Sequence, residues 1–464
     1  MKTIPGKAAS LVTSSLALWL ALCATPGIAA DPTNTAGTKS PDWLRKSVVY
    51  EIFPRQFSKE GDFNAITARL DELKDLGVDI LWLMPVHPTG QKMKKGSIGS
   101  PYAVRDYYAI NPDYGSTNDL KRLIAEAHQR GMKVILDIVA GHTAWDSVLL
   151  VDHPEFYKKD ASGKIIPPNP DWSDVAGLNY ENPALRRYMI DMLKYWLKDF
   201  GVDGFRCDVA FTVPIEFWET ARGELEQLHP EVILLADANA APKLVSKAFD
   251  MDNSGALDSA LNKVMSGIAP AYLLNRSWEN TRQQFPEGSL HLRFSDNHEN
   301  IRAVARFGMQ GALAAQVLML SLDGVPLFYN GMEVGDATES ADPALFEKLP
   351  VFWSPGGRPP LREIYRNLIQ LRKQHPAFHD DHVVWLQNTA PADIITISRK
   401  DEKDEFVILI NLSSRVVTGS VEIPGAEDFT LLKIAGMTAL PKSTLPEFQL
   451  GGYEWRIYQR PLAK

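Results

Sequence analysis

The apolar and polar positions of this chain follow a repeating pattern. An amphipathic stretch ends in Gly and a short apolar run follows at once, as in LGVDILWLMP, RGMKVILDIV and FGVDGFRCDV at residues 76–85, 130–139 and 200–209. Gly ends a helix because it adopts the left-handed conformation without strain, and a continuous Val/Ile/Leu run is typical of a strand covered on both faces. The pattern therefore predicts helices that alternate with buried parallel strands.

Five further apolar runs bring the number of predicted strands to eight. They lie at residues 48–53, 232–236, 248–251, 290–294 and 325–329. Eight such units over roughly 330 residues favour an α/β fold of the (β/α)₈ TIM-barrel type with one insertion. An open, Rossmann-like sheet is the alternative, and its usual Gly-rich phosphate motif after the first strand is missing here.

Two regions depart from this alternation and define the predicted domains. Residues 143–183, after the third strand, are rich in Pro, Asp, Asn and Trp, and loops of that length usually carry function. We therefore predict a barrel over residues 43–378 with an inserted loop domain at 143–183. From 379 to 464 the chain consists of short β-rich runs separated by turn residues, which is typical of a small antiparallel β-sandwich.

The N-terminus has the layout of a secretory signal peptide. Two lysines precede an apolar run at residues 11–24, and small residues lead to position 30. The apolar run is short for a membrane span, so we favour a cleaved signal over an uncleaved anchor. Lipid attachment at Cys23 is less favoured because the bulky Leu22 precedes it. The sequence predicts an exported protein, periplasmic or extracellular, without a membrane span after cleavage and with a flexible lead-in at 31–42.

Composition narrows the class of partner. Cys207 is the only cysteine left after removal of the signal peptide, so the mature chain has no internal disulfide and depends on an ordinary core. The net charge is −8, and the chain has no basic tract of the kind that binds nucleic acid or an anionic membrane. A neutral partner fits this balance. The sequence carries no signal for an oligomeric state.

Polar side chains gather where four of the predicted strands end, at the C-terminal face where the active sites of such barrels lie. A lone Asp in such a place is more often a helix cap, but four coincident groups on one face favour an active site. These groups are Asp137 with His142, Arg206 with Asp208, Asp237, and Asp296 with His298 and Glu299.

Paired carboxyl groups at this face suggest glycoside hydrolysis with retention, which needs a nucleophile and an acid/base about 5–5.5 Å apart. Arg206 lies two residues before Asp208 and therefore faces the same side of the strand. We expect its guanidinium to lower the pKa of Asp208 and keep this nucleophile ionised. The alternative is a buried ion pair at the barrel rim.

From about residue 48 to its C-terminus, the chain resembles the α-amylase family of glycoside hydrolases. The segments that carry the resemblance are VVYEIFPRQFS (48–58), LDELKDLGVDILWLMPV (70–86), PYAVRDYYAINPDYGS (101–116), DIVAGHT (137–143), GFRCDV (204–209), LLADANA (234–240) and FSDNHEN (294–300).

The resemblance implies a site and a substrate. The substrate would be an α-glucan or maltooligosaccharide. Asp208 would be the nucleophile, Asp237 the acid/base, and Glu299 the third carboxylate, which stabilises the transition state. The implied sugar-binding residues are Tyr102, His142, Arg206 and His298.

Three positions depart from the family pattern. Asp237 replaces the usual Glu, Glu299 replaces the usual Asp, and Gly141 replaces a calcium-binding Asn. Calcium is doubtful at Gly141, which offers no side-chain oxygen, and no other cofactor is expected. Asp is one methylene shorter than Glu, and a misplacement of about 1 Å can cost on the order of 100-fold in rate.

These departures leave three hypotheses open. In the first, the two carboxylate changes compensate one another and the protein is an active hydrolase. In the second, it is a non-catalytic α-glucan-binding protein on the same scaffold. In the third, it is a transglycosylase or isomerase. Aromatic rings in the insertion (Trp145, Trp172, Tyr180) and Phe211 after the nucleophile are either sugar platforms or local core.

Overall fold

The structure is a computed structural model that describes residues 40–239, 241–253, 255–353, 361–435 and 444–462. The predicted signal peptide at 1–30 and the lead-in up to residue 39 lie outside the described residues. Residues 36–464 belong to one compact unit.

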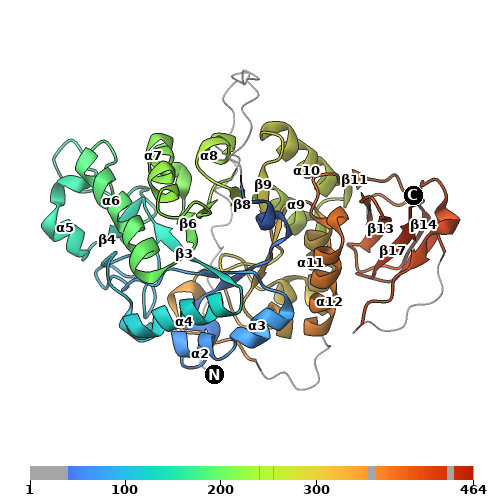
Figure 1. Cartoon of the computed structure of the whole chain (residues 1–464), viewed down its shortest axis with the longest axis horizontal. Helices are drawn as coiled ribbons and strands as arrows, with labels where there is room; N and C mark the ends of the chain where they lie inside the picture. Colours follow the sequence, from blue (N-terminus) through green and yellow to red (C-terminus); the bar gives the residue numbers. More distant parts are fainter. Residues whose placement is uncertain (1–39, 240, 254, 354–360, 436–443, 463–464) are drawn as a thin grey trace, which may run out of the picture. The chain divides into compact units, whose positions relative to one another are not determined.

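Eight parallel strands close into a barrel in which chain neighbours are sheet neighbours, and β10 pairs with β1 (Figure 1). The strands are β1 (Val49–Ile52), β2 (Ile80–Leu83), β3 (Lys133–Val139), β6 (Gly204–Asp208), β7 (Ile233–Ala236), β8 (Met251–Asn253), β9 (Leu290–Arg293) and β10 (Val325–Tyr329). All eight overlap the apolar runs that predicted them. The predicted barrel fold is confirmed.

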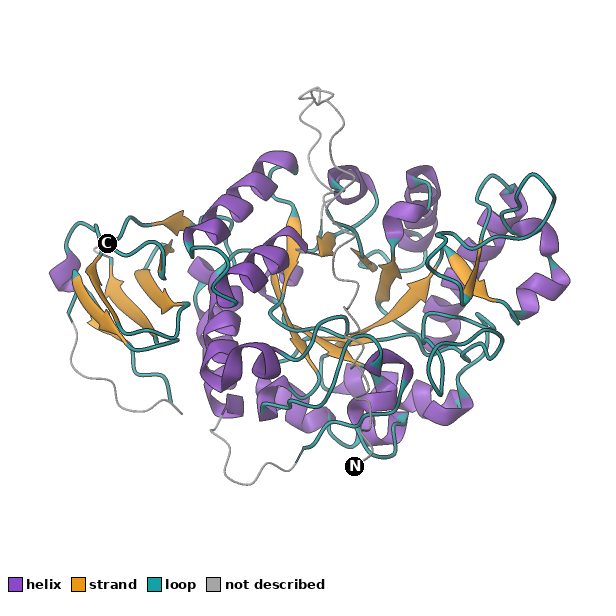
Figure 2. Cartoon of the chain, turned by 180° about the vertical axis from the view of Figure 1, so that it is seen from behind, coloured by secondary structure: helices purple, strands orange, loops and turns teal. Residues whose placement is uncertain are grey.

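Helices alternate with the strands and pack around the barrel (Figure 2). The described helices are α1 (Pro54–Phe57), α2 (Phe63–Thr67), α3 (Leu70–Leu76), α4 (Thr117–Gln129), α5 (Val148–Asp152), α6 (Pro183–Tyr195), α7 (Ile215–Glu226), α8 (Pro242–Lys247), α9 (Gly255–Met265), α10 (Tyr272–Gln284), α11 (Ala303–Ser321) and α12 (Leu361–Gln374). As the sequence predicts, Gly77 ends α3 in the left-handed region, with φ 106°.

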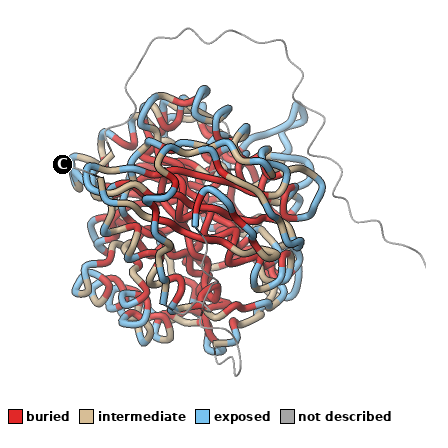
Figure 3. The backbone as a smooth tube through the Cα atoms, turned by 90° about the vertical axis from the view of Figure 1, so that its right-hand side faces the viewer, coloured by how far each residue is buried: buried red, intermediate tan, exposed pale blue. Residues whose placement is uncertain are grey.

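The core has two layers that the strand alternation separates. Side chains such as Val49, Ile135 and Leu292 fill the barrel interior, whereas Tyr50 and Phe205 face the helices. Figure 3, which looks at the molecule from the side of the C-terminal sheets, shows buried residues in the interior and exposed residues at the periphery. Helix α11 is long and apolar enough to cross a membrane, but 67% of its most apolar window is buried, as in a core helix.

The inserted segment carries regular structure of its own, unlike the structureless loop that the sequence suggested. Strands β4 (His142–Ala144) and β5 (Val175–Gly177) form a two-stranded antiparallel sheet, and α5 lies between them in the chain. This pairing joins the two ends of the insertion and holds it over the carboxyl end of β3.

The C-terminal region contains two antiparallel sheets, as predicted for a β-sandwich. One has the order β11-β12-β13-β17-β15 and the other pairs β14 with β16. Their strands are β11 (Val384–Trp385), β12 (Ile394–Lys400), β13 (Asp404–Asn411), β14 (Val417–Ser420), β15 (Thr430–Leu431), β16 (Glu447–Leu450) and β17 (Trp455–Pro461). Ile394, Val407 and Phe448 pack into one cluster shared by both sheets. The sequence did not predict β16.

Candidate functional site

Strand alternation places a polar layer above the apolar interior of the barrel. In β1, β3 and β7 the inward positions in the first part of the strand are apolar, and the inward position that follows them is Glu51, Asp137 or Asp237. In β6 the inward positions from Gly204 onward are Arg206 and Asp208. The charged side chains of four strands therefore meet at the carboxyl ends of the strands, where barrel active sites lie.

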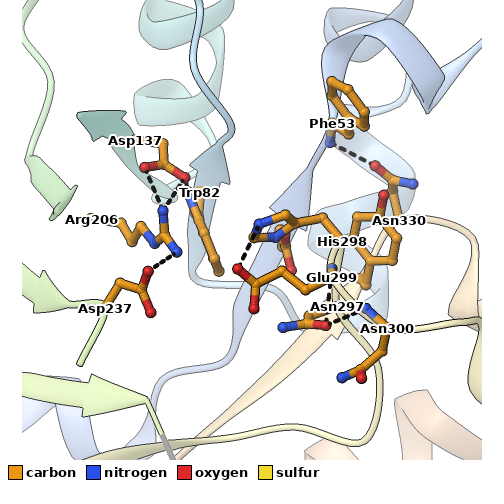
Figure 4. A network of polar contacts seen from close by, with 12 residues as sticks. Phe53, Trp82, Asp137, Arg206, Asp237, Asn297, His298, Glu299, Asn300 and Asn330 are labelled. Atoms are coloured by element: carbon orange, nitrogen blue, oxygen red, sulfur yellow. Dashed lines mark hydrogen bonds and ion pairs between the residues drawn. The ribbon is translucent and has the colours of Figure 1, made fainter. Parts of the chain in front are cut away.

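Arg206 stands at the centre of this layer, with a side chain that is only 1% exposed. Its Nη1 donates to Asp137 Oδ1 at 2.9 Å and to Asp208 Oδ1 at 2.8 Å. Its Nη2 forms an ion pair with Asp237 Oδ2 at 2.8 Å. Figure 4 shows the guanidinium between Asp137 and Asp237. One cation thus links three carboxylates from three neighbouring strands.

Asp237 receives hydrogen bonds on both of its oxygens. Asn253 Nδ2 donates to Oδ1 at 2.5 Å, and the backbone N–H of Val209 donates to Oδ2 at 3.1 Å. Val209 adopts the left-handed region, with φ 39°, directly after Asp208. Together with Arg206, these groups give Asp237 three donors, each of which stabilises the ionised carboxylate.

His298 belongs to a second chain of contacts. Its Nδ1 lies 2.5 Å from Glu51 Oε1, and its Nε2 lies 2.8 Å from the hydroxyl of Tyr102 and 3.8 Å from Glu299 Oε1. Burial alone would lower the pKa of His298, but the charge and hydrogen bond of Glu51 outweigh burial and raise this pKa to about 9. The imidazole is therefore protonated at neutral pH.

The pKa of Asp208 moves in the direction opposite to our expectation. Burial raises it to about 8, the carboxylates of Asp237 and Asp137 add to this rise, and Arg206 opposes it. Arg206 does lower the pKa of Asp208, but by less than burial and the neighbouring carboxylates together raise it. Burial likewise raises the pKa of Asp137, to about 6, against the same arginine. The expectation that Arg206 leaves Asp208 with a lowered pKa was wrong.

The charges of the layer explain this result. Five carboxyl groups (Glu51, Asp137, Asp208, Asp237 and Glu299) share one guanidinium and one imidazolium. Full ionisation would leave a net negative charge in a poorly solvated space, so a proton is retained there at neutral pH. Negative charge that is already in place also suits a reaction in which positive charge develops on the substrate.

A pocket of about 300 Å³ opens above this layer. Of the residues that the sequence singled out, it is lined by Tyr102, His142, Asp208, His298 and Glu299. Asp237 and Arg206 do not line it. The Asp208 and Asp237 side chains are 10% and 12% exposed, whereas that of Glu299 is 58% exposed. The predicted residues therefore meet at one site, but not all of them reach the pocket.

The pocket is also lined by Lys95, Asp174 and Phe346, which the sequence did not assign to the site. Lys95 forms an ion pair of 3.2 Å with Asp174 of the insertion and lies over the ring of Phe346. Trp172 packs against His142, with ring centroids 5.6 Å apart, and lines the same pocket.

The other aromatic residues in question take different places. Tyr180 is buried, and its hydroxyl donates to the carbonyl of Ala140, so it belongs to the local core. Trp145 donates through its indole N–H to the carbonyl of Ser173 and braces the insertion. Phe211 is 56% exposed and does not line the pocket.

The place that calcium would occupy near the third strand does not fit the ion. A Cβ added to Gly141 would lie 2.8 Å from Thr212 Oγ1, so the neighbouring hydroxyl fills the space of a larger side chain. That hydroxyl donates to the carbonyl of Val209. Within the described ranges, no three His, Cys, Asp or Glu side chains gather as metal ligands. We derive no step through a metal.

Glu51 and Asn253 are functional candidates that sequence reasoning missed. Glu51 interrupts an otherwise apolar strand, and this polar position in a buried run was the available signal. Asn253 ends β8 and carries no comparable signal, because its contact with Asp237 depends on the closure of the barrel.

Comparison with known proteins gives one consistent result. The family model "Alpha amylase, catalytic domain" matches residues 33–161 and 170–354. The chain is 30% identical over 410 residues to Alpha-amylase MalA of Haloarcula japonica, a match that covers 84% of this chain and 58% of that protein. The chain thus spans little more than half of that relative's length.

Two solved structures are similar over nearly the whole described chain. The maltogenic alpha-amylase AmyB from Thermotoga neapolitana superposes with a TM-score of 0.81 at 28% identity, covering 90% of this chain and 100% of that one. An alpha-amylase from Lactobacillus plantarum superposes with a TM-score of 0.80 at 30% identity, covering 90% and 99%.

Proposed function

This chain belongs to the α-amylase family of glycoside hydrolases, and we propose that it cleaves α-glucosidic bonds of maltooligosaccharides and α-glucans with retention of configuration. The observation that carries the proposal is the pocket of about 300 Å³ whose floor combines Asp208 with Glu299, above the carboxylate network of Arg206.

In this proposal Asp208 attacks the anomeric carbon and forms a glycosyl-enzyme, which water then hydrolyses. Arg206 holds one oxygen of Asp208 at 2.8 Å and leaves the other free for attack. Tyr102 provides a ring face for the sugar at the cleavage point, and His142 and His298 line the same pocket beside it. The excess of carboxylates stabilises the oxocarbenium-like transition state, because positive charge develops next to them.

The sequence resemblance gives Asp237 the role of acid/base and Glu299 that of the stabilising carboxylate. In this proposal one of the two donates the proton to the leaving oxygen, and the other stabilises the bound sugar. Hydrolysis and transfer to a sugar acceptor share this chemistry up to the glycosyl-enzyme and differ in what attacks it. Product analysis by mass distinguishes a hydrolysed from a transferred glycosyl unit.

The proposal is tested by product release from maltoheptaose and soluble starch, with Asp208→Asn as the control. We expect release by the unaltered protein and a loss of at least roughly 10³-fold in the variant, because no glycosyl-enzyme forms without the nucleophile. An Asp208→Asn protein that is as active as the unaltered one on every α-glucan tested would refute the proposal.

Non-catalytic α-glucan binding is the alternative that one observation favours, namely that Asp237 does not line the pocket. Calorimetry that shows maltooligosaccharide binding, with no turnover after long incubation, supports this alternative. Restoring Glu at position 237 and Asp at position 299 should then create activity if the loss is purely geometric.

We also propose that the protein is exported through cleavage of residues 1–30. The support is the signal-like pattern of the N-terminus. N-terminal sequencing of the protein recovered outside the cytoplasm should begin at or near Asp31. Recovery of full-length chain in the cytoplasm alone would contradict export.

A further inference from the structure

We propose that Glu299 is the residue that donates and recovers the proton during catalysis, and that Asp237 is a positioning residue that fixes Arg206. This exchange of roles rests on the retaining activity proposed above. It rests on two observations: Glu299 lines the pocket and Asp237 does not, and the oxygens of Asp237 are held by donors of the protein.

Asp237 is poorly arranged to hold a proton. Its two oxygens accept from Asn253 Nδ2, from the backbone N–H of Val209 and from Arg206 Nη2. A carboxylic acid is a weaker acceptor than a carboxylate, so protonation would weaken all three contacts at once. The bond to Arg206 would also lose its charge. Both oxygens of Asp237 are thus already occupied by donors of the protein, whereas a general acid needs an oxygen that faces the leaving group.

Asp237 is also in the wrong place to reach a leaving oxygen. Its side chain does not line the pocket, whereas Asp208 and Glu299 do. The Asp side chain ends one methylene earlier than Glu would, and a shortfall of about 1 Å costs on the order of 100-fold in rate. The contact with Arg206 holds the carboxylate in this place, so a shift into the pocket would break an ion pair.

Glu299 has the opposite properties. It lines the pocket together with Asp208, and its side chain is 58% exposed. Figure 4 shows this side chain extending from the loop after β9 toward Arg206 and Asp237. Among the residues that the structure describes, the nearest cation is His298 Nε2 at 3.8 Å, which is beyond hydrogen-bond distance. The carboxylate oxygens of Glu299 are thus open to a substrate.

Charge around Glu299 favours retention of a proton. Desolvation within the pocket raises the pKa of Glu299, the negative charge of Asp237 adds to the rise, and the imidazolium of His298 opposes it. Because the Glu299 side chain is exposed, solvent screens these charges and reduces the rise of its pKa. The direction is the one that a general acid at neutral pH requires, as in other glycosidases whose acid carboxyl is perturbed upward.

The resulting reaction balances in two steps. In the first, which starts from ionised Asp208 and protonated Glu299, an oxygen of the Asp208 carboxylate forms a bond to the anomeric carbon, the glycosidic C–O bond breaks, and the proton on Glu299 moves to the leaving oxygen. In the second, a water oxygen bonds to the anomeric carbon, its proton moves to the Glu299 carboxylate, and the bond to Asp208 breaks. Asp237 keeps Arg206 beside the nucleophile throughout.

Two substrates with different leaving groups separate the roles. Release of an alcohol from maltoheptaose needs a proton, whereas release of fluoride from α-maltosyl fluoride needs little protonation. We expect Glu299→Gln to lose roughly 10²–10⁴-fold on maltoheptaose. The same variant should keep a kcat/KM on the fluoride within about tenfold of the unaltered protein, because formation of the glycosyl-enzyme from this substrate needs no acid. Its turnover should then be limited by the second step, in which Glu299 is the base.

Azide provides a second readout. It attacks the glycosyl-enzyme without a general base, so it should accelerate Glu299→Gln and yield α-maltosyl azide, with retained configuration. The matched variant Asp237→Asn should lose a similar factor on both substrates, because a displaced Arg206 impairs the nucleophile itself. Azide should not restore that variant.

The outcomes distinguish failure of this inference from failure of the proposed function. The inference would be overturned if Glu299→Gln lost activity equally on both substrates and azide did not restore it. It would also be overturned if Asp237→Asn lost activity on maltoheptaose but not on the fluoride and was restored by azide. If Asp237→Asn does not fold, Glu299→Gln decides alone, since its exposed side chain accepts no hydrogen bond from the described residues that a Gln would lose. No release from either substrate by the unaltered protein, with Asp208→Asn indistinguishable from it, would instead refute the function.

Discussion

Glu51→Gln is the most informative single substitution for the electrostatics of this site. Glu51 is fully buried in β1, and its Oε1 lies 2.5 Å from His298 Nδ1. Gln keeps the shape and a hydrogen-bond partner but removes the charge. Because burial by itself lowers the pKa of His298, we expect this pKa to fall from about 9 to below its ordinary value of 6.5.

The magnitude follows from that difference. The fall of the pKa from about 9 to 6.5 corresponds to ~3 kcal/mol, and the interaction between Glu51 and protonated His298 is larger than this because it also offsets burial. A histidine whose folded pKa is raised contributes stability that is complete below pH 6.5 and is lost as the pH rises through 9. Glu51→Gln should therefore be most costly at pH 6 and least costly near pH 10.

The assay is NMR titration of ring-labelled histidines, with the His298 resonance assigned by its disappearance in His298→Gln. Thermal unfolding at pH 6 and pH 10 gives the second readout. The matched control is Asp252→Asn, which removes the carboxylate 2.5 Å from His291 Nδ1 and should leave His298 unchanged. A wild-type His298 that titrates at or below 6.5, or a resonance that stays near 9 in Glu51→Gln, would refute the reasoning.

Three further predictions test the same layer and its support. Asp208→Asn should raise the melting temperature, and the rise should be larger at pH 9 than at pH 5. The reason is that a carboxyl whose pKa is raised to about 8 destabilises the fold when it ionises. A variant with the same melting temperature as the unaltered protein at pH 9 would contradict this. Arg206→Met leaves three buried carboxylates without their cation and should cost about 3–5 kcal/mol in chemical unfolding, whereas a loss below about 1 kcal/mol would argue against a central role. Gly204→Ala places a Cβ 2.0 Å from the carbonyl oxygen of Ile233 and should sharply reduce the soluble yield, while Gly223→Ala, which meets no atom within 4 Å, serves as the control.

The fold followed closely from the sequence because its signals are local. Each barrel strand is a short apolar run between amphipathic helices, and the run does not depend on its neighbours for recognition. The missed strand β16 (Glu447–Leu450) shows the limit of this approach. Its burial alternates between exposed and buried positions over four residues, and a run so short is identified only by its pairing with β14.

The site was predictable as a set of residues and less so as an arrangement. Tyr102, Asp208 and His298 belong to recognisable strand-end segments and do meet at one pocket. Lys95 and Asp174 lie in loops without a local signal, and only the packing of the insertion against the barrel brings them together.

The sequence by itself determined the eight-stranded barrel, the polar groups at four strand ends and the family resemblance, because periodicity and local motifs encode these properties. Only the tertiary structure decided the sign of the pKa shift at Asp208 and which carboxylates line the pocket. These properties depend on the sum of charges contributed by five separate elements and on the exclusion of water among them. Neither quantity exists until the barrel has closed, and so neither could be read from any one segment.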